Sequence, residues 1–336
     1  MKVAILFNPI SGAGKALAAA ELLKRGLETD GVDVRLRPTE RRPTSEWLAP
    51  ALTDVDALVV AGGDGAVRMA APEAARARVP LWHAPCGTEN LFARAFGMRA
   101  DPRSVARALV AGKTRAIDLA RADHEHFNIM ASVGFDADVV HVLAARRTGA
   151  ISHLSYARPI LELARAWKPS QLAWSIDGER EELGPGLVVV GNLREYGVRL
   201  NPTPDAEPDD GLLDAVYLPA RGALDLLSWV PLLRFGLAGK VSFASADYRA
   251  RRGQHITLEA SPAAKLQLDG DAATDAPAAG AAGSGAGVRG GGTGGGLGGG
   301  LGGGLGGGTG GGVSTPQPAA RHFWTEPSAL RVLLPG

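Results

Sequence analysis

The sequence predicts two domains: an N-terminal, doubly wound α/β domain and a second, mainly antiparallel β-sandwich. Up to about residue 120, short apolar runs rich in branched residues alternate with stretches of helical spacing. That alternation is typical of a parallel sheet covered on both faces. Beyond this point strand-like runs follow one another with few helices between them, which favours an antiparallel domain. A chain of 336 residues has room for both.

The first domain, residues 1–120, is expected to build its sheet from alternating units. Strands are predicted over 3–7, 32–36, 57–61 and 80–84, and helices over 16–27, 45–52, 66–71, 91–96 and 102–111. Ser45 and Asp101 stand where two of these helices begin and are expected to cap them. Because ligands bind beyond the carboxyl ends of parallel strands, the turns after the first, third and fourth strands should face one crevice.

The second domain is expected over residues 121–275. Strands are predicted over 116–120, 127–133, 172–176, 187–190, 215–218, 256–260 and 265–268, with helices over 137–146 and 155–167. A last strand, over 329–334, can return to either domain, and residues 322–336 are its widest extent. The apolar stretch from Leu224 to Leu237 is either a core helix broken near Pro231 or a segment that contacts a bilayer.

One turn organises the first domain. The predicted strand over 57–61 runs into Gly62-Gly63-Asp64-Gly65, and a helix follows. The glycines are expected to adopt positive φ and to bring backbone N–H groups close to a ligand. Asp64 would repel a bare phosphate, but it suits a phosphate that carries a divalent cation. The turn therefore predicts a site for a metal-bound nucleotide; the plainer alternative is a strand-to-helix turn stabilised by its Asp.

A second candidate phosphate turn follows the first strand. Asn8-Pro9 and Ser11-Gly12 lie there, just before Lys15. This is not a Walker A loop, because Ala16 follows Lys15 and Pro9 replaces the first glycine. Lys15 itself is interpreted as a surface charge at a helix start.

Composition excludes several classes of function. The net charge of +1 implies no nucleic-acid partner. The single cysteine, Cys86, allows no internal disulfide and fits a reducing compartment. No run of about 20 apolar residues exists to form a transmembrane helix, and the apolar run at the N-terminus is too short for a signal peptide. We expect a cytoplasmic protein, soluble or peripheral at a membrane; a homodimer stays open. Residues 276–316, almost all Gly, Ala, Thr and Leu, are predicted to be a disordered insertion.

Taken in order, the motifs of this chain resemble the diacylglycerol kinase catalytic-domain family, which includes bacterial lipid kinases, diacylglycerol kinases, and sphingosine and ceramide kinases. The matching segments are Asn8-Pro9 with Ser11-Gly12, Gly62 to Gly65, Pro85 with Gly87-Thr88 and Asn90, Phe92-Ala93-Arg94, Val133 to Ala137, Asp209 to Leu213, and Leu268 to Asp271. Nicotinamide-nucleotide kinases share the glycine turn, but the later segments look more like the lipid kinases.

The resemblance implies an ATP- and Mg²⁺-dependent kinase that phosphorylates a lipid hydroxyl at a membrane surface. It implies a nucleotide site, in the cleft between the two domains, lined by Asn8, Pro9, Ser11, Gly12, Thr39, Gly62, Gly63, Asp64, Gly65, Ala66, Arg68 and Thr88. Asp64 would act on the catalytic magnesium, and Asp271 would take the proton of the hydroxyl. A second magnesium would be held by the Asp210 side chain with the carbonyl groups of Glu207 and Leu212.

Three residues depart from the family pattern. Ala66 and Arg68 stand where the family usually has Thr and Asn, and Asp271 stands where it usually has Glu. These changes remove a hydroxyl, add a cation near the phosphates and shorten the base by one methylene group. Two alternatives to an active lipid kinase therefore stay open: a degraded homologue that binds nucleotide or lipid without turnover, and a nicotinamide-nucleotide kinase. The sequence does not name the lipid.

Overall fold

The computed structural model describes residues 1–9, 14–145, 154–238, 240, 247–274 and 319–336. The described residues up to 274, together with residues 319–336, form one compact unit. Ser11 and Gly12 lie outside the described residues, and so does the predicted disordered insertion over 276–316. The domain boundaries expected from the sequence stay a prediction.

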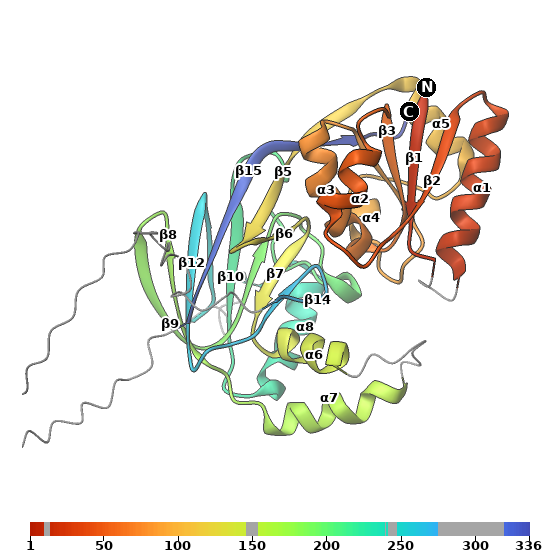
Figure 1. Ribbon diagram of the computed structural model, residues 1–336. Coiled ribbons are helices and arrows are strands. Elements are labelled where there is room, and N and C mark those ends of the chain that lie inside the picture. The colour runs from red at the N-terminus through yellow and green to blue at the C-terminus, as the bar shows by residue number, and fades with distance from the viewer. Residues whose placement is uncertain (10–13, 146–153, 239, 241–246, 275–318) are drawn as a thin grey trace, which may run out of the picture. The chain divides into compact units, whose positions relative to one another are not determined.

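The N-terminal part of this unit is a parallel sheet with helices on both faces (Figure 1). Its spatial order is β2–β1–β3–β4, and every neighbouring pair is parallel. The strands are β1 (Lys2–Phe7), β2 (Asp33–Pro38), β3 (Ala57–Gly62) and β4 (Leu81–Pro85). Chain order reverses between β1 and β3, and ligands bind at such a reversal in doubly wound sheets.

The helices of this part pack in two groups. On one face α1 (Lys15–Thr29) packs against α5 (Pro102–Ala111), and on the other α2 (Thr44–Ala51) packs against α3 (Asp64–Ala77). This division follows from right-handed crossovers that run in opposite directions from β1. The short helix α4 (Leu91–Ala95) follows β4.

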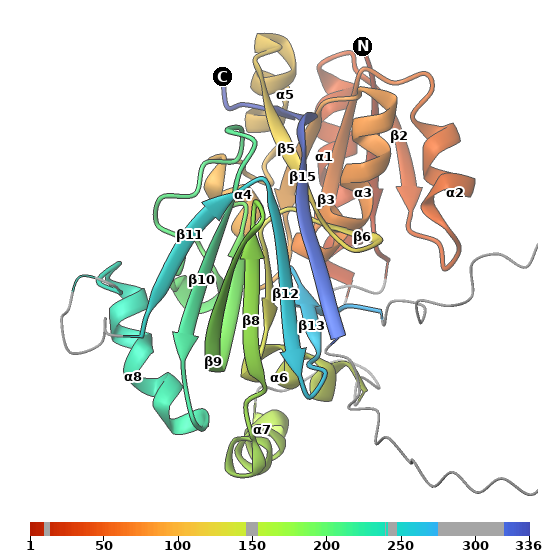
Figure 2. The same ribbon diagram turned by 90° about the vertical axis from the view of Figure 1, so that its left-hand side faces the viewer.

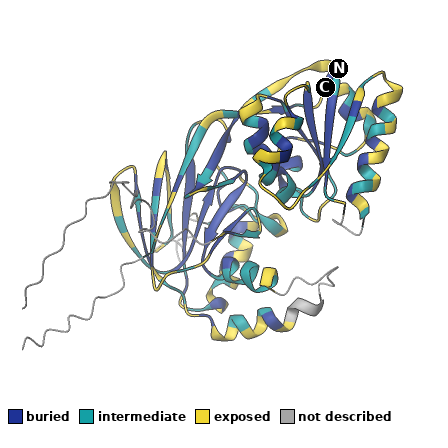
Figure 3. Ribbon diagram, in the orientation of Figure 1, coloured by how far each residue is buried: buried dark blue, intermediate teal, exposed yellow. Residues whose placement is uncertain are grey.

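Burial explains why the sequence of this sheet is so apolar. All residues of β3 are buried, and the strands carry most of the dark blue in Figure 3. Strands covered on both faces need apolar side chains at every position rather than at alternate ones. The largest buried side chains include Trp82 and Phe92.

Of the two predicted helix caps, one is present and the other is not. Asp101 caps α5, because its carboxylate accepts a hydrogen bond from the Ser104 amide at 2.9 Å. The prediction for Ser45 was wrong, since α2 already begins at Thr44 and Pro43 occupies the cap position without a side-chain hydrogen bond.

The rest of the unit is a β-sandwich of two mainly antiparallel layers (Figure 2). The strands are β5 (Thr114–Ala122), β6 (Glu125–Phe127), β7 (Met130–Val133), β8 (Gln171–Ile176), β9 (Glu179–Gly191), β10 (Leu213–Pro219), β11 (Arg249–Gly253), β12 (His255–Ser261), β13 (Leu266–Leu268), β14 (Asp271–Ala272) and β15 (Ala319–Leu333). One layer holds β8, β12, β15, β5 and β6, and the other holds β14, β13, β7, β10 and β11.

Strand β9 belongs to both layers. Its first part pairs with β8, and its last part pairs with β7 and β10. Gly184, with φ of +92°, lies where the strand leaves the first layer. Apolar side chains such as Trp174 and Phe127 form the sandwich core. The predicted fold class is therefore confirmed.

Strand β15 is the last strand of the chain, and it pairs with strands of both the sandwich and the parallel sheet. It pairs antiparallel with β12 and then with β5, and its end pairs with β4 through Val332 and Leu81. It is longer than the 329–334 predicted and joins both sheets. Strand β11 went unpredicted because it is an edge strand of the sequence Arg-Ala-Arg-Arg-Gly, which has no apolar pattern.

Three helices complete the described part of the sandwich: α6 (Phe135–Ala145), α7 (Leu154–Ala166) and α8 (Ala223–Arg234). Helix α8 runs through Pro231, so the predicted break there was wrong. Across the portion of the chain that the structure describes, no helix is both long enough and apolar enough to cross a bilayer.

Candidate functional site

The turns that follow β1, β2, β3 and β4 line one cavity of about 840 Å³. Asp271, from the sandwich, lies at the same cavity. Its lining residues are Asn8, Pro9, Lys15, Ala16, Thr39, Glu40, Arg41, Gly62, Gly63, Gly65, Ala66, Met69, Cys86, Gly87, Thr88 and Asp271. Turns far apart in the sequence thus meet at one edge of the sheet, as expected from the parallel strand order.

Most of the residues predicted to bind nucleotide lie at this cavity. The described ones that do are Asn8, Pro9, Thr39, Gly62, Gly63, Gly65, Ala66 and Thr88. Asp64 and Arg68 are not among the lining residues. Lys15 is, although its sequence position indicated only a surface charge, and Arg41 adds a second cation that no sequence pattern marked.

The glycines of the central turn work by close approach and not by positive φ. Gly63 has φ of −98°, and Gly62, Gly65 and Gly87 also lie outside the left-handed region, so this expectation was wrong. A Cβ atom on Gly87 would lie 2.7 Å from the Cα of Gly63. The turns after β3 and β4 therefore touch backbone to backbone, which only glycine allows.

The Asn90 side chain closes the turn after β4. Its Oδ1 accepts from the Gly87 amide and its Nδ2 donates to the Gly87 carbonyl, both at 2.8 Å. These two hydrogen bonds fix the turn in which Thr88 lies exposed at the cavity. Asn90 was part of a family motif, but the sequence assigned it no role.

Asp64 points toward α4. Its two carboxylate oxygens accept hydrogen bonds from the amides of Leu91 and Phe92, each at 3.0 Å. A carboxylate is favoured there by the free N–H groups and the positive end of the helix. Asp64 therefore stabilises structure, as the plainer alternative predicted, but it does so through the start of α4 and not within its own turn. The role of Asp64 at a catalytic magnesium stays a prediction.

His83 lies directly beneath the glycine turn. Its Nε2 lies 2.9 Å from the Gly62 carbonyl oxygen, and its side chain is fully buried. Burial lowers the pKa of His83, so the ring is neutral near pH 7 and donates to that carbonyl. His83 is therefore a packed support of the turn, as expected for a histidine without metal-ligand spacing.

A tight hairpin places Asp271. Asp269 and Gly270 join β13 to β14 with φ of +51° and +86°, as in a type I′ turn. The Asp269 carboxylate accepts from the amides of Asn128, Ile129 and Met130 at 2.7–2.9 Å. Those bonds interrupt the single strand predicted over 127–133. Burial raises the pKa of Asp269 to about 6, although these amides and the charge of Arg68 lower it in part.

Asp271 follows that hairpin and keeps its side chain 40% exposed. A Cβ atom on Gly65 would lie 2.7 Å from Asp271 Oδ2, so the carboxylate lies directly against the glycine turn. Arg68 Nη2 lies 3.6 Å from the same oxygen. The two acidic candidates of the sequence thus separate: Asp271 lies at the cavity, whereas Asp64, the first residue of α3, binds the first amides of α4.

Comparison with known proteins identifies the family. The diacylglycerol kinase catalytic domain matches residues 2–122, and the YegS C-terminal NAD kinase beta sandwich-like domain matches residues 129–286. A diacylglycerol kinase of Mycobacterium tuberculosis is 32% identical over 286 residues, which cover 82% of this chain and 91% of that protein. This chain belongs to the diacylglycerol kinase catalytic-domain family.

A second relative and a solved structure give similar results. A protein of Pseudomonas fluorescens named "Probable lipid kinase YegS-like" is 32% identical over 255 residues, 72% of this chain and 80% of that protein. A crystal structure from Bacillus anthracis, described as a candidate diacylglycerol kinase, superposes with a TM-score of 0.68 at 18% identity. It covers 99% of this chain and 95% of its own, and it supports the fold.

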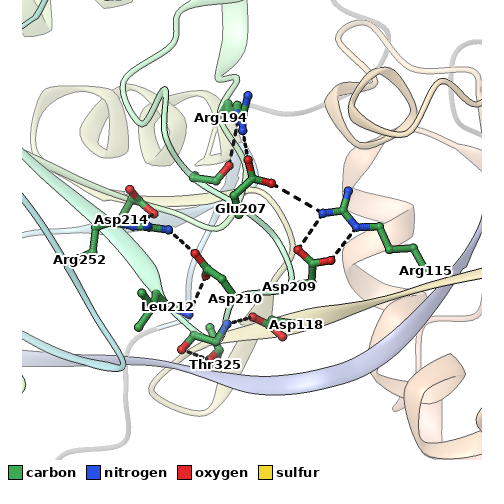
Figure 4. Close-up of polar contacts among 12 residues, drawn as sticks. Arg115, Asp118, Arg194, Glu207, Asp209, Asp210, Leu212, Asp214, Arg252 and Thr325 are labelled. Atoms are coloured by element: carbon green, nitrogen blue, oxygen red, sulfur yellow. Dashed lines mark hydrogen bonds and ion pairs between the residues drawn. The ribbon is translucent and has the colours of Figure 1, made fainter.

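The second magnesium site predicted for a family member falls on a loop rich in ion pairs (Figure 4). Asp210 Oδ1 accepts from the Leu212 amide at 3.0 Å, and Asp210 Oδ2 pairs with Arg252. Glu207 pairs with Arg194. The Asp210 side chain that the resemblance assigns to the cation is thus paired with an arginine. The Glu207 side chain is paired too, but the resemblance assigns only the carbonyl group of Glu207 to the cation.

Neighbouring carboxylates complete this loop. Arg115 forms a two-pronged pair with Asp209 at 2.7 and 2.8 Å, and Asp118 accepts from the Gly211 and Ser328 amides at 2.7 Å. Asp118 is buried, and burial raises its pKa. Both oxygens of Asp210 thus have a partner, and the magnesium site stays a prediction.

The cavity also has few side chains that could hold a metal ion. Within the described part of the chain, no three acidic, histidine or cysteine side chains are grouped as a metal site requires. Glu40 and Asp271 are the acidic residues at the cavity. Two carboxylates are few for a resident metal ion, whereas Mg²⁺ that is bound together with phosphate oxygens commonly uses only one or two.

Proposed function

We propose that this chain is an ATP-dependent lipid kinase that transfers the γ-phosphoryl group to a lipid hydroxyl, such as that of diacylglycerol. The observation that carries the proposal is the position of Asp271. A carboxylate from the sandwich lies at a cavity otherwise formed by the turns of the α/β sheet. A base from one part and a phosphate cradle from another, meeting at one cavity, are what phosphoryl transfer to a hydroxyl requires.

The cavity suits a nucleotide in size and charge. Its volume of about 840 Å³ lies within the range of small-molecule pockets, roughly 300–1,000 Å³. Lys15 and Arg41 supply positive charge for the phosphates. Magnesium bound with ATP would neutralise the phosphate oxygens.

The reaction follows from these positions. The lipid hydroxyl oxygen attacks the γ-phosphorus in line, and the bond from that phosphorus to the β–γ bridging oxygen breaks. Asp271 takes the hydroxyl proton, ADP leaves with the bridging oxygen, and the lipid becomes a phosphate monoester. The glycine-turn amides and the two cations would stabilise the charge of the transferring group.

Helix α8 supports a lipid substrate at a membrane surface. Trp229 and Leu233 pack into the core, while Leu224 and Leu227 on the opposite face are 78% and 63% exposed. Phe235, just after the helix, is 73% exposed. Large apolar side chains that gather on the exposed face of a helix are normally covered, so this face suits an apolar partner. The exposed Arg199, Arg221, Arg234 and Lys240 lie on or beside this segment and favour anionic lipid headgroups.

Nucleotide binding can be tested through Cys86. This is the only cysteine of the sequence, and it lies half-buried at the cavity. ATP with magnesium should slow the reaction of Cys86 with a thiol reagent, whereas UMP or inorganic phosphate should protect it much less. Labelling at the same rate with and without ATP would contradict a nucleotide in this cavity.

Transfer is tested with radiolabelled ATP and a lipid panel of diacylglycerol, sphingosine and phosphatidylglycerol in micelles. We expect label in a lipid, identified by mass spectrometry, and a rate that is lowered by about 10²- to 10⁴-fold but still measurable with Asp271→Asn. Protection of Cys86 without transfer to any lipid would indicate the degraded homologue, which Ala66, Arg68 and Asp271 motivate. Transfer to a nicotinamide nucleotide in place of a lipid would contradict the proposal.

A further inference from the structure

Arg68 does not lie where a nucleotide ligand should. Its side chain is 19% exposed, it is not among the residues that line the cavity, and its Nε is buried without a partner among the described residues. The guanidinium instead spans two carboxylates. Nη1 donates to Glu125 Oε2 at 3.2 Å, and Nη2 lies 3.6 Å from Asp271 Oδ2.

Glu125 holds Arg68 in that orientation. Its Oε1 accepts from both the amide and the hydroxyl of Thr274, at 2.7 and 2.8 Å. Burial acts to raise the pKa of Glu125, but these bonds and the charge of Arg68 outweigh it and lower the pKa below its ordinary value. Glu125 is thus a fixed anion on β6, and it presents Nη2 of Arg68 to Asp271.

We infer that Arg68 is the positioning residue for Asp271, and that the two residues form a matched pair. The inference rests on the proposed function. Arg68 holds Oδ2, which also touches Gly65, and this leaves Oδ1 to accept the proton of the hydroxyl. The shorter Asp side chain leaves space for the guanidinium, and the guanidinium fixes a carboxylate that would otherwise rotate freely.

The first test compares kcat with KM, using dioleoylglycerol in detergent micelles as acceptor. We expect Arg68→Gln to lower kcat by about 10- to 100-fold, the loss typical of a misplaced group, with KM for ATP and the affinity for ADP unchanged. Glu125→Gln should lower kcat in the same way but less. Arg78→Gln is the matched control, because Arg78 is an exposed arginine at the end of the same helix.

Two double variants test the pairing. Arg68→Gln with Asp271→Asn should be no slower than Asp271→Asn alone, because Arg68 acts only through Asp271. Arg68→Asn with Asp271→Glu should recover part of the kcat lost in Arg68→Asn, since the longer carboxylate fills the space of the guanidinium. A merely structural arginine would show neither result.

The outcomes separate the inference from the function on which it rests. An Arg68→Gln enzyme with normal kcat overturns the positioning role. Weakened ADP binding in place of a lowered kcat also overturns it, and would indicate that Arg68 contacts the nucleotide. A wild-type chain that phosphorylates no lipid overturns the function. In that case urea midpoints of the single and double variants still test the pair, and simply additive shifts would overturn it.

Discussion

At Gly65, the residue that best suits the helix differs from the residue that leaves space for Asp271. It lies in the first turn of α3, where alanine is the better helix former. Yet a Cβ there would lie 2.7 Å from Asp271 Oδ2, the mobile end of a side chain. Only the carboxylate has to move to make room for it.

We therefore predict that Gly65→Ala leaves the unfolding free energy unchanged or raises it by up to about 1 kcal/mol, while transfer falls roughly 10- to 100-fold. Thermal unfolding and the lipid kinase assay measure the two effects on the same protein. In the Asp271→Asn background Gly65→Ala should have no further effect on rate. A marked loss of stability would show that the turn, and not Asp271, lacks the space.

Asp269 makes a second prediction at this scale. Its folded pKa of about 6 lies above the ordinary value of 3.8, so the folded state binds the proton more tightly. Stability from this group is present below about pH 4 and is lost as pH rises through 6, by about 3 kcal/mol at about 1.4 kcal/mol per pKa unit.

Urea unfolding of wild type and Asp269→Asn at several pH values measures this effect. The stability of wild type relative to the variant should fall between about pH 4 and pH 7 and be flat above that range. A relative stability that rises with pH would mean that the three amide donors outweigh burial and hold the carboxylate charged.

At the scale of elements, the site depends on α4 as much as on the strands. This helix has five residues, too few to be stable alone, and its first amides are bound by Asp64 from α3. Asp64 therefore fixes the position of the turn that carries Thr88.

We predict that Asp64→Ala destabilises the protein by about 1–3 kcal/mol, because two amides lose a charged acceptor, and that Asp64→Asn costs less. Urea unfolding measures both. If Asp64→Ala abolishes transfer with no change in unfolding free energy, Asp64 acts on the chemistry and not on α4. Asp271→Asn is thus the cleaner low-activity control.

At the scale of the whole molecule, strand β15 and the Arg68–Glu125 contact both link the parallel sheet to the sandwich. The cavity takes residues from both, so its geometry depends on the compact unit as a whole. The same unit exposes one face of α8, which is the proposed membrane contact of the whole molecule.

We predict that Leu224→Gln with Leu227→Gln weakens binding to vesicles containing phosphatidylglycerol by about tenfold or more, since each buried leucine contributes about 1.5–3 kcal/mol. Thermal stability should stay unchanged, because both side chains are exposed. Leu22→Gln on α1, also exposed, is the matched control. Equal vesicle binding by all three proteins would exclude α8 as the membrane contact.

The sequence alone determined the order of strands and helices, the parallel sheet and the meeting of its turns, because apolar periodicity and strand direction are local properties that fix these features. It also found Asp271 within a motif. It did not reveal β11, whose edge position needs no apolar pattern. The reason for the glycines also stayed hidden, because close approach depends on a partner from another turn.

Only the tertiary structure decided what the charged residues contact. Asp64 turns to α4, Arg68 to Glu125 and Asp271, and Asp210 to Arg252. Each contact joins residues far apart in the chain, and a carboxylate or guanidinium binds whichever partner the fold brings within reach. Sequence spacing therefore marked the residues of the site, while their partners, and hence their tasks, came from packing.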